Sequence, residues 1–149
     1  MRKECEVLVA DATGQDMPVI ERVLAEIHTN CRALLLQTLE ASREHVRARV
    51  ADLGHQWSQP DLVLLGPHLR DGDGLTLLRE IKADPRTRPI PVVVIAGDAD
   101  ESLMETAYLL GANSFIQRPA DSADFSRLCT AVIRYWLRLN TPFGSLEYH

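Results

Sequence analysis

The chain has 149 residues, of which 46% are hydrophobic and 25% charged. This is enough for one well-packed domain and too little for two ordinary ones. A formal net charge of -5 argues against a protein that binds nucleic acid by neutralising phosphates. The N-terminus has no apolar signal segment, and no apolar run approaches the roughly 18 to 20 residues that cross a membrane, so we expect a cytoplasmic protein without membrane contact.

In the first half of the chain, short apolar runs alternate with segments whose apolar residues recur at helical spacing. Apolar runs of four or five residues suit buried strands, and recurrence every three to four residues indicates amphipathic helices. The predicted elements are a strand over 6–10, a helix that follows Asp16 and runs through Ile27, a strand over 33–36, a helix over 39–53 and a strand over 61–65.

The second half continues the alternation after a loop over 66–74, which is rich in glycine and aspartate. It predicts a helix through Leu75, Leu78 and Ile81, a strand over 90–95, a helix over 103–110, a strand over 114–117 and a last helix opened by Asp121. Five strands alternating with five helices imply a parallel sheet covered on both faces. Chemistry then gathers at the carboxyl ends of the strands.

Two stretches resemble the receiver domains of bacterial response regulators. They are PDLVLLGPHLRDGDGLTLLREIKADPRTRPIPVVVIAG over 60–97 and YLLGANSFIQRPAD over 108–121. The resemblance implies a flavodoxin-like (βα)5 α/β fold with strand order 2-1-3-4-5, residues 1–139 forming one domain and 140–149 a tail. The segment RYWLRLNTPF, with LGANSF, is similar to small single-domain regulators that partner bacterial phytochromes.

Receivers of this family hold Mg²⁺ with two carboxylates after the first strand and one after the third, and the third-strand aspartate accepts the phosphoryl group. Here Asp11 fills the first acidic position, but Ala12 stands at the second. Gly66 replaces the phosphorylated aspartate, Ala96 the hydroxyl residue and Arg118 the lysine. Glycine has no side chain, so no acyl phosphate can form at this position, and two of the three metal ligands are missing.

We therefore predict a non-phosphorylatable pseudo-receiver that acts by protein–protein binding, with no metal, cofactor or enzymatic activity. The expected partners are a histidine kinase, a phytochrome or a downstream effector. The alternative is a small-ligand sensor that uses the vacated pocket around Gly66, Ala96 and Arg118. An enzyme of the same topology is disfavoured, because the chain has neither a nucleophile–base pair nor a GxGxxG loop.

Several side chains at this edge have two interpretations. Arg118 either pairs with Asp11 in place of the lost metal, which we favour, or reads an anion. His68 is expected to be an exposed loop histidine, with a phosphohistidine or ligand role as the alternative. Phe115, at the switch aromatic position, is expected to be a fixed, buried ring. Asp71 and Asp73 fit a turn better than a calcium loop.

Other residues bear on surfaces and redox state. Candidate interface residues, for a partner or for a homodimer through the fourth helix, fifth strand and last helix, are Tyr108, Tyr135, Trp136 and Leu139. The last three, late in the last helix, fit a role in covering the core equally well. The arginines Arg43, Arg47 and Arg49 lie among acidic residues and predict a solvated helix face. The three cysteines, an odd number far apart in sequence, disfavour a disulfide framework and predict buried reduced thiols. These are Cys5, Cys31 and Cys129.

Overall fold

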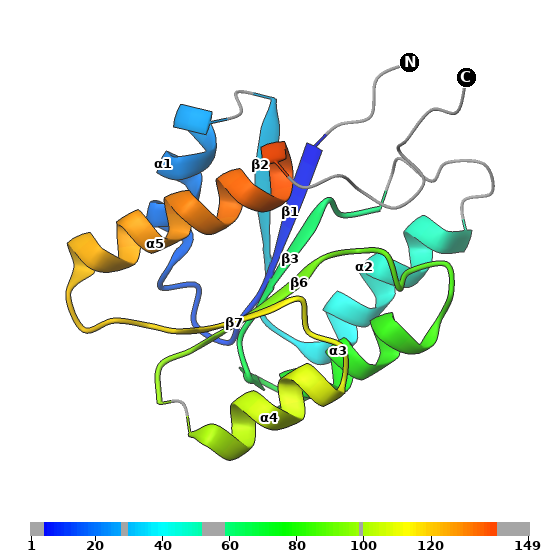
Figure 1. Ribbon diagram of the computed structural model, residues 1–149. Helices are drawn as coiled ribbons and strands as arrows, with labels where there is room; N and C mark the ends of the chain where they lie inside the picture. Colours follow the sequence, from blue (N-terminus) through cyan, green and yellow to red (C-terminus); the bar gives the residue numbers. More distant parts are fainter. Residues whose placement is uncertain (1–4, 28–29, 52–58, 99, 140–149) are drawn as a thin grey trace, which may run out of the picture.

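Five parallel strands form the central sheet of the computed structural model, which describes residues 5–27, 30–51, 59–98 and 100–139 (Figure 1). Their order is β2-β1-β3-β6-β7. This confirms the predicted order 2-1-3-4-5, since β6 and β7 are the fourth and fifth strands of this sheet. The strands are β1 (Cys5–Ala10), β2 (Cys31–Leu36), β3 (Leu62–Leu65), β6 (Val92–Ala96) and β7 (Ser114–Gln117).

Helices cover both faces of the sheet, as the alternation of elements predicted. Figure 1 shows α1 and α5 on one face and α2, α3 and α4 on the other. The helices are α1 (Met17–Ile27), α2 (Leu39–Ala51), α3 (Gly74–Ala83), α4 (Glu101–Leu109) and α5 (Ser122–Arg134), which continues as a π-helical turn, η2 (Tyr135–Leu139). The predicted end of the second helix at residue 53 and the tail over 140–149 lie outside the described residues.

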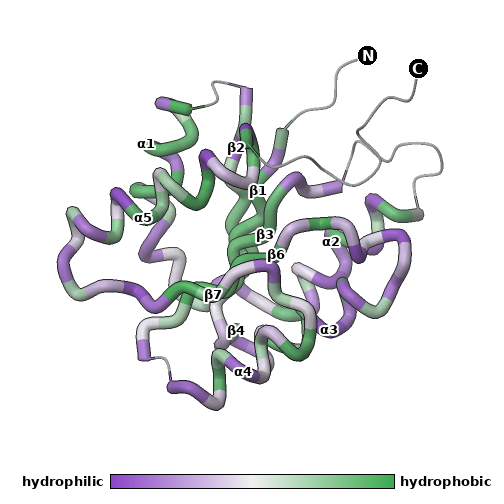
Figure 2. The backbone as a smooth tube through the Cα atoms, in the orientation of Figure 1, coloured by the Kyte–Doolittle hydropathy of each residue, from purple (hydrophilic) through white to green (hydrophobic). Residues whose placement is uncertain are grey.

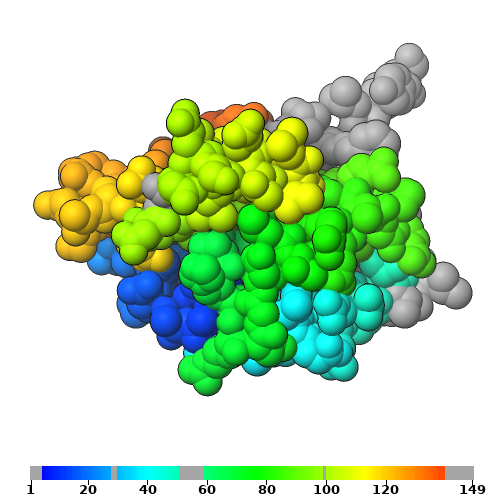
Figure 3. Space-filling view, turned by 90° about the horizontal axis from the view of Figure 1, so that it is seen from below, coloured from blue at the N-terminus to red at the C-terminus, as the bar shows by residue number. Residues whose placement is uncertain are grey.

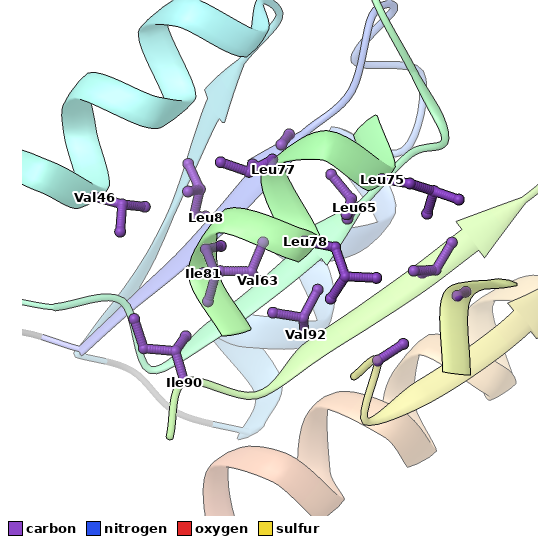
Figure 4. Close-up of a cluster of buried hydrophobic side chains, with 14 of the residues drawn as sticks. Leu8, Val46, Val63, Leu65, Leu75, Leu77, Leu78, Ile81, Ile90 and Val92 are labelled. Carbon is purple, nitrogen blue, oxygen red and sulfur yellow. The ribbon is translucent and has the colours of Figure 1, made fainter. Parts of the chain in front are cut away.

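The strands are apolar on both faces because both are covered. Along β1, Leu8 and Ala10 belong to the core beneath α2 and α3, whereas Val7 and Val9 belong to the core beneath α1 and α5. Figure 2 shows the hydrophobic strands at the centre of the molecule, and Figure 4 shows the first of the two cores. Burying one such side chain contributes about 1.5–3 kcal/mol, so these short runs carry much of the stability.

Aspartates begin three of the helices. The carboxylates of Asp73, Asp100 and Asp121 accept hydrogen bonds from backbone N–H groups in the first turns of α3, α4 and α5. The predicted start at Asp121 is confirmed, and α4 begins two residues before the predicted 103. The loop over 66–74 contains a short antiparallel hairpin, β4 (His68–Leu69) and β5 (Gly72–Asp73), which composition did not predict.

The expectation of three reduced thiols is wrong for two of them. Cys5 and Cys31 form a disulfide, with their Cα atoms 4.3 Å apart. Their separation of 26 residues hid this contact, but the parallel register pairs Cys5 of β1 directly with Cys31 of β2. Cys129 is free and buried, as expected, and burial raises the pKa of its thiol to about 12. Among the described residues, no helix is long and apolar enough to cross a membrane.

Candidate functional site

The predicted site residues meet at the carboxyl edge of the sheet. Asp11, Gly66 and Arg118 follow β1, β3 and β7, and Ala96 ends β6. Backbone hydrogen bonds join neighbours across this edge, from Gly66 N to Ala10 O and from Arg118 N to Ala96 O, each of 2.8 Å. Figure 3 looks at this side of the molecule, where the blue segment after β1, the green segment after β3 and α4 share one face.

The Asp11 carboxylate occupies the space above Gly66. A Cβ atom placed on Gly66 would overlap Asp11 Oδ1. The other oxygen, Oδ2, accepts hydrogen bonds from Thr13 N at 3.2 Å, Thr13 Oγ1 at 2.9 Å and Gly14 N at 3.1 Å. The loop after β1 therefore engages one oxygen of this carboxylate, and the other oxygen lies where a side chain on residue 66 would begin.

A second glycine fixes the backbone on the other side of residue 66. Gly74 N donates to Pro67 O at 2.9 Å, and a Cβ on Gly74 would overlap the Gly66 carbonyl oxygen. The first turn of α3 therefore packs directly on the end of β3, and only glycine permits this approach. This close approach explains why the last residue of the sequence RDGDG is a glycine.

Arg118 pairs with Asp16 and not with Asp11, contrary to the prediction. The guanidinium donates to both Asp16 oxygens, one of them at 2.7 Å, in a bidentate pair. Its Cζ also lies 4.8 Å from the centre of the Phe125 ring. The hydrogen bonds that Arg118 donates to Asp16 raise the pKa of Arg118 above its ordinary value, even though burial lowers it. The physical reason is that Asp11 is already held by its own loop, whereas Asp16 is buried at the start of α1.

The backbone carbonyl of Ala12 collects two side-chain donors that sequence reasoning missed. Gln37 Nε2 and Arg70 Nε each donate to this oxygen at 3.1 Å. Arg70 comes from the connection between β4 and β5, so its guanidinium lies over the loop that follows β1. The hairpin is anchored further by Asp71, whose carboxylate accepts from Leu39 N and from Glu40 N. The position of Asp71 in a glycine-rich loop predicted a turn. It did not indicate that the Asp71 carboxylate would cap α2.

The remaining predicted residues lie around this edge. His68 is exposed on β4, as expected. Phe115 is half-buried and not fully buried, because β7 is an edge strand; its ring packs on the core cluster. The Phe115 N–H donates to Tyr108 Oη at 3.1 Å, so α4 satisfies an outward-facing group of β7. Asp71 and Asp73 both cap helices.

The candidate interface residues differ in exposure. Tyr108, Tyr135 and Leu139 are exposed, whereas Trp136 is half-buried against the core beneath α1 and α5. The Tyr135 and Trp136 rings meet edge to face with centroids 4.9 Å apart. Leu109, which the sequence did not single out, is 81% exposed at the end of α4. The sequence signal that could have identified Leu109 as exposed is the presence of an apolar residue at the last position of a short helix.

Comparison with known proteins identifies a family and several relatives of this chain. The family model for the response regulator receiver domain matches residues 15–132. The probable methanogenesis regulatory protein FilR2 of Methanothrix harundinacea is 35% identical over 138 residues, which cover 93% of this chain and 86% of FilR2. Response regulator Rcp1 of Synechocystis is 30% identical over 83 residues, 56% of this chain and 56% of Rcp1, so that alignment spans about half of each protein.

Solved structures show the same fold. The crystal structure of the phosphorylated cyanobacterial phytochrome response regulator RcpA superposes with a TM-score of 0.83 at 24% identity. The superposition covers 95% of this chain and 99% of that one. At this identity the likeness concerns the arrangement of the strands and helices and not the chemistry of the site.

Proposed function

This chain belongs to the response regulator receiver domain family, and on that basis we propose that it is a pseudo-receiver that signals by binding proteins without being phosphorylated. Receivers of this family serve in two-component signalling and are not an enzyme family. The observation that carries the proposal is the position of Asp11. Its carboxylate lies where the side chain of a phosphorylated aspartate at residue 66 would begin.

The residues present do not fit the Mg²⁺ ion that phosphorylation in this family needs. Mg²⁺ prefers several oxygen ligands in near-octahedral geometry. Among the described residues, Asp11 supplies the carboxylate beside Gly66, and its Oδ2 already accepts three hydrogen bonds, whereas Asp16 is held by Arg118. Ala12 has no ligand to offer, and its carbonyl accepts from the cationic Arg70. A guanidinium beside the metal position opposes a divalent cation.

The Arg118–Asp16 pair supports a receiver fixed in one conformation. It ties the segment after β7 to the start of α1, and Phe125 of α5 lies beneath the same guanidinium. A working receiver uses the equivalent basic residue to contact the phosphoryl group. Here the donors that would face an anion are engaged by an internal carboxylate, so the position of this segment needs no phosphoryl group.

Exposed apolar side chains on two elements support protein binding as the mode of action. Tyr108 and Leu109 of α4 are exposed beside the edge strand β7, and Tyr135 and Leu139 of η2 are exposed after α5. Aromatic residues on a surface are typical of interfaces. Similarity to Rcp1 and to the phytochrome response regulator RcpA favours a phytochrome-linked partner or kinase, with a homodimer through α4, β7 and α5 as a further arrangement.

The ligand-sensor alternative receives less support. Asp11 fills the space above Gly66, and Arg118 is engaged by Asp16, so two of the groups that would form a vacated pocket are already in contact with protein. Ala96, the third, is fully buried.

Incubation with acetyl phosphate and Mg²⁺, followed by intact-mass measurement, tests the central claim. We expect no added phosphoryl group on the full chain. The positive control is a restored variant that carries Ala12→Asp, Gly66→Asp, Ala96→Ser and Arg118→Lys. The variant His68→Gln separates a phosphohistidine from an acyl phosphate. A hydroxylamine-sensitive adduct on the unmodified chain that persists in His68→Gln would overturn the proposal.

A further inference from the structure

A groove of about 470 Å³ lies between α2 and α3, away from the candidate site. The α3 helix starts at Gly74 beside Gly66, whereas the groove extends to Ala83 and Thr87 at and beyond the other end of this helix. Its floor is apolar and includes Val46 of α2 and Ile81 of α3, two side chains that Figure 4 shows in the same core cluster. The groove is thus separate from the edge that carries Asp11.

The carboxylates that line the groove are already paired. Both oxygens of Glu80 accept hydrogen bonds of 2.7 Å from Arg43, which fills the bidentate geometry. Asp84 accepts from Arg86 Nε at 3.1 Å and from Nη2 at 2.9 Å, which leaves Nη1 of this exposed guanidinium for an external acceptor. Arg47 reaches Glu80 only at 3.6 Å, as a second and longer contact to a carboxylate that Arg43 already holds. The donors of Arg47 are therefore largely free for an external acceptor.

The two rims of the groove carry exposed positive charge. Arg47 on α2 and Arg86 after α3 each have side chains 70% exposed to solvent. The lining holds three arginines against two carboxylates, a local excess of one positive charge on a chain whose net charge is -5. An apolar floor between cationic rims complements a segment with an apolar side chain flanked by carboxylates.

We infer that the α2–α3 groove binds an acidic peptide segment of a partner protein, one apolar side chain entering over Val46, Val50 and Ile81 while its carboxylates meet Arg47 and Arg86. This interaction surface is independent of the α4, β7 and α5 surface and of phosphorylation. The sequence alone predicted a solvated face for Arg43, Arg47 and Arg49; the structure keeps only Arg47 of the three exposed.

Two synthetic peptides test the inference on the full chain. One has leucines flanked by glutamates, and the other has glutamine in place of every glutamate. Fluorescence anisotropy and backbone NMR shifts measure binding. We expect the acidic peptide to shift the signals of Val46, Val50 and Ile81, and to bind at least about tenfold more weakly when Arg47→Glu and Arg86→Glu are combined.

A matched control is Arg127→Glu on α5, because Arg127 is 72% exposed and, like Arg86, pairs with a nearby carboxylate. We expect this variant to bind the acidic peptide like the unmodified chain. Equal binding of the glutamine peptide, an equal loss in Arg127→Glu, or the absence of shifts at the groove would each overturn the inference. Octanoate binding as tightly as the peptide would overturn it in favour of a small carboxylate. None of these outcomes bears on the acetyl phosphate experiment.

Discussion

The two ends of the parallel sheet both carry acidic side chains but neutralise them in different ways. At the carboxyl end, Asp11 is held by backbone and hydroxyl donors of its own loop, and Asp16 by the guanidinium of Arg118. At the amino end, Glu6 accepts from His45 Nε2 at 2.6 Å and from Arg32 at 3.0 Å. At both ends, therefore, the acidic side chains are offset by donors and cations of the protein itself.

The strongest test of the carboxyl end is Arg118→Ala. The change leaves buried Asp16 without its bidentate partner and removes the cation from the Phe125 ring. Breaking a buried pair at one partner is strongly destabilising. We expect the free energy of unfolding, measured with urea, to fall by about 3 kcal/mol, at the low end for buried pairs because this one is partly exposed.

The exposed pair on α5 provides the control for this measurement. Arg127 is bonded to Asp124 one helical turn away, and both are largely exposed. Arg127→Ala should change stability by less than about 0.5 kcal/mol. If Arg118→Ala were equally mild, the Arg118–Asp16 pair would not hold the segment after β7, and the fixed conformation would lose its support.

Gly66→Asp tests whether Asp11 fills the site. The new side chain would overlap Asp11 Oδ1 and place a second negative charge beside it. We expect the free energy of unfolding at neutral pH to fall by about 2 kcal/mol through overpacking and charge repulsion. Adding Asp11→Asn should recover about half of this loss. Full stability of Gly66→Asp in urea would show that the carboxylate moves away without cost.

The fold could be predicted from the sequence because its signals are local. Apolar runs such as Val92–Ala96 and the spacing of Ile20, Val23 and Ile27 need no knowledge of distant partners. The strand order came from the family resemblance, and the sheet pairing confirms it. Positions at the carboxyl ends of the strands followed from the same topology.

Pairwise contacts could not be predicted in this way. Arg118 and Asp16 are 102 residues apart, and nothing local showed that Asp11 would be satisfied by Thr13 and Gly14. The disulfide between Cys5 and Cys31 was not predicted for a related reason, because this contact depends on the register between β1 and β2. Sequence patterns thus place residues at an edge, whereas competition among donors decides which acid each cation meets.

At the amino end, Glu6→Gln should change how stability depends on pH. Burial raises the pKa of Glu6, but the hydrogen bond and charge of His45, the charge of Arg49 and the Arg32 bond lower it more, so the pKa lies below its ordinary value. A lowered folded pKa stabilises the protein above the unfolded pKa. We expect Glu6→Gln to cost about 1.5 kcal/mol near neutral pH.

The direction of the pH effect distinguishes a stabilising charge on Glu6 from a contact of Glu6 that does not depend on its charge. As pH falls below the unfolded pKa of glutamate, about 4.3, and then through the lower folded value, the charge-dependent stability of Glu6 is lost. The difference in unfolding free energy between the unmodified chain and Glu6→Gln should therefore shrink in acid. Urea titrations at several pH values measure it; a difference that is constant down to about pH 3 would contradict the lowered pKa of Glu6.

The smallest effect should come from Arg32→Ala, and it ranks the partners of Glu6. Arg32 forms its bond to Glu6 with a side chain that is 57% exposed, so solvent screens the pair. We expect a loss of about 0.5 kcal/mol, reduced further by salt. His45→Ala should cost more, because its ring is largely buried against the same carboxylate. If Arg32→Ala had the larger effect, a surface cation would contribute more to the stability of Glu6 than the largely buried ring of His45 does, and this ranking of its partners would be wrong.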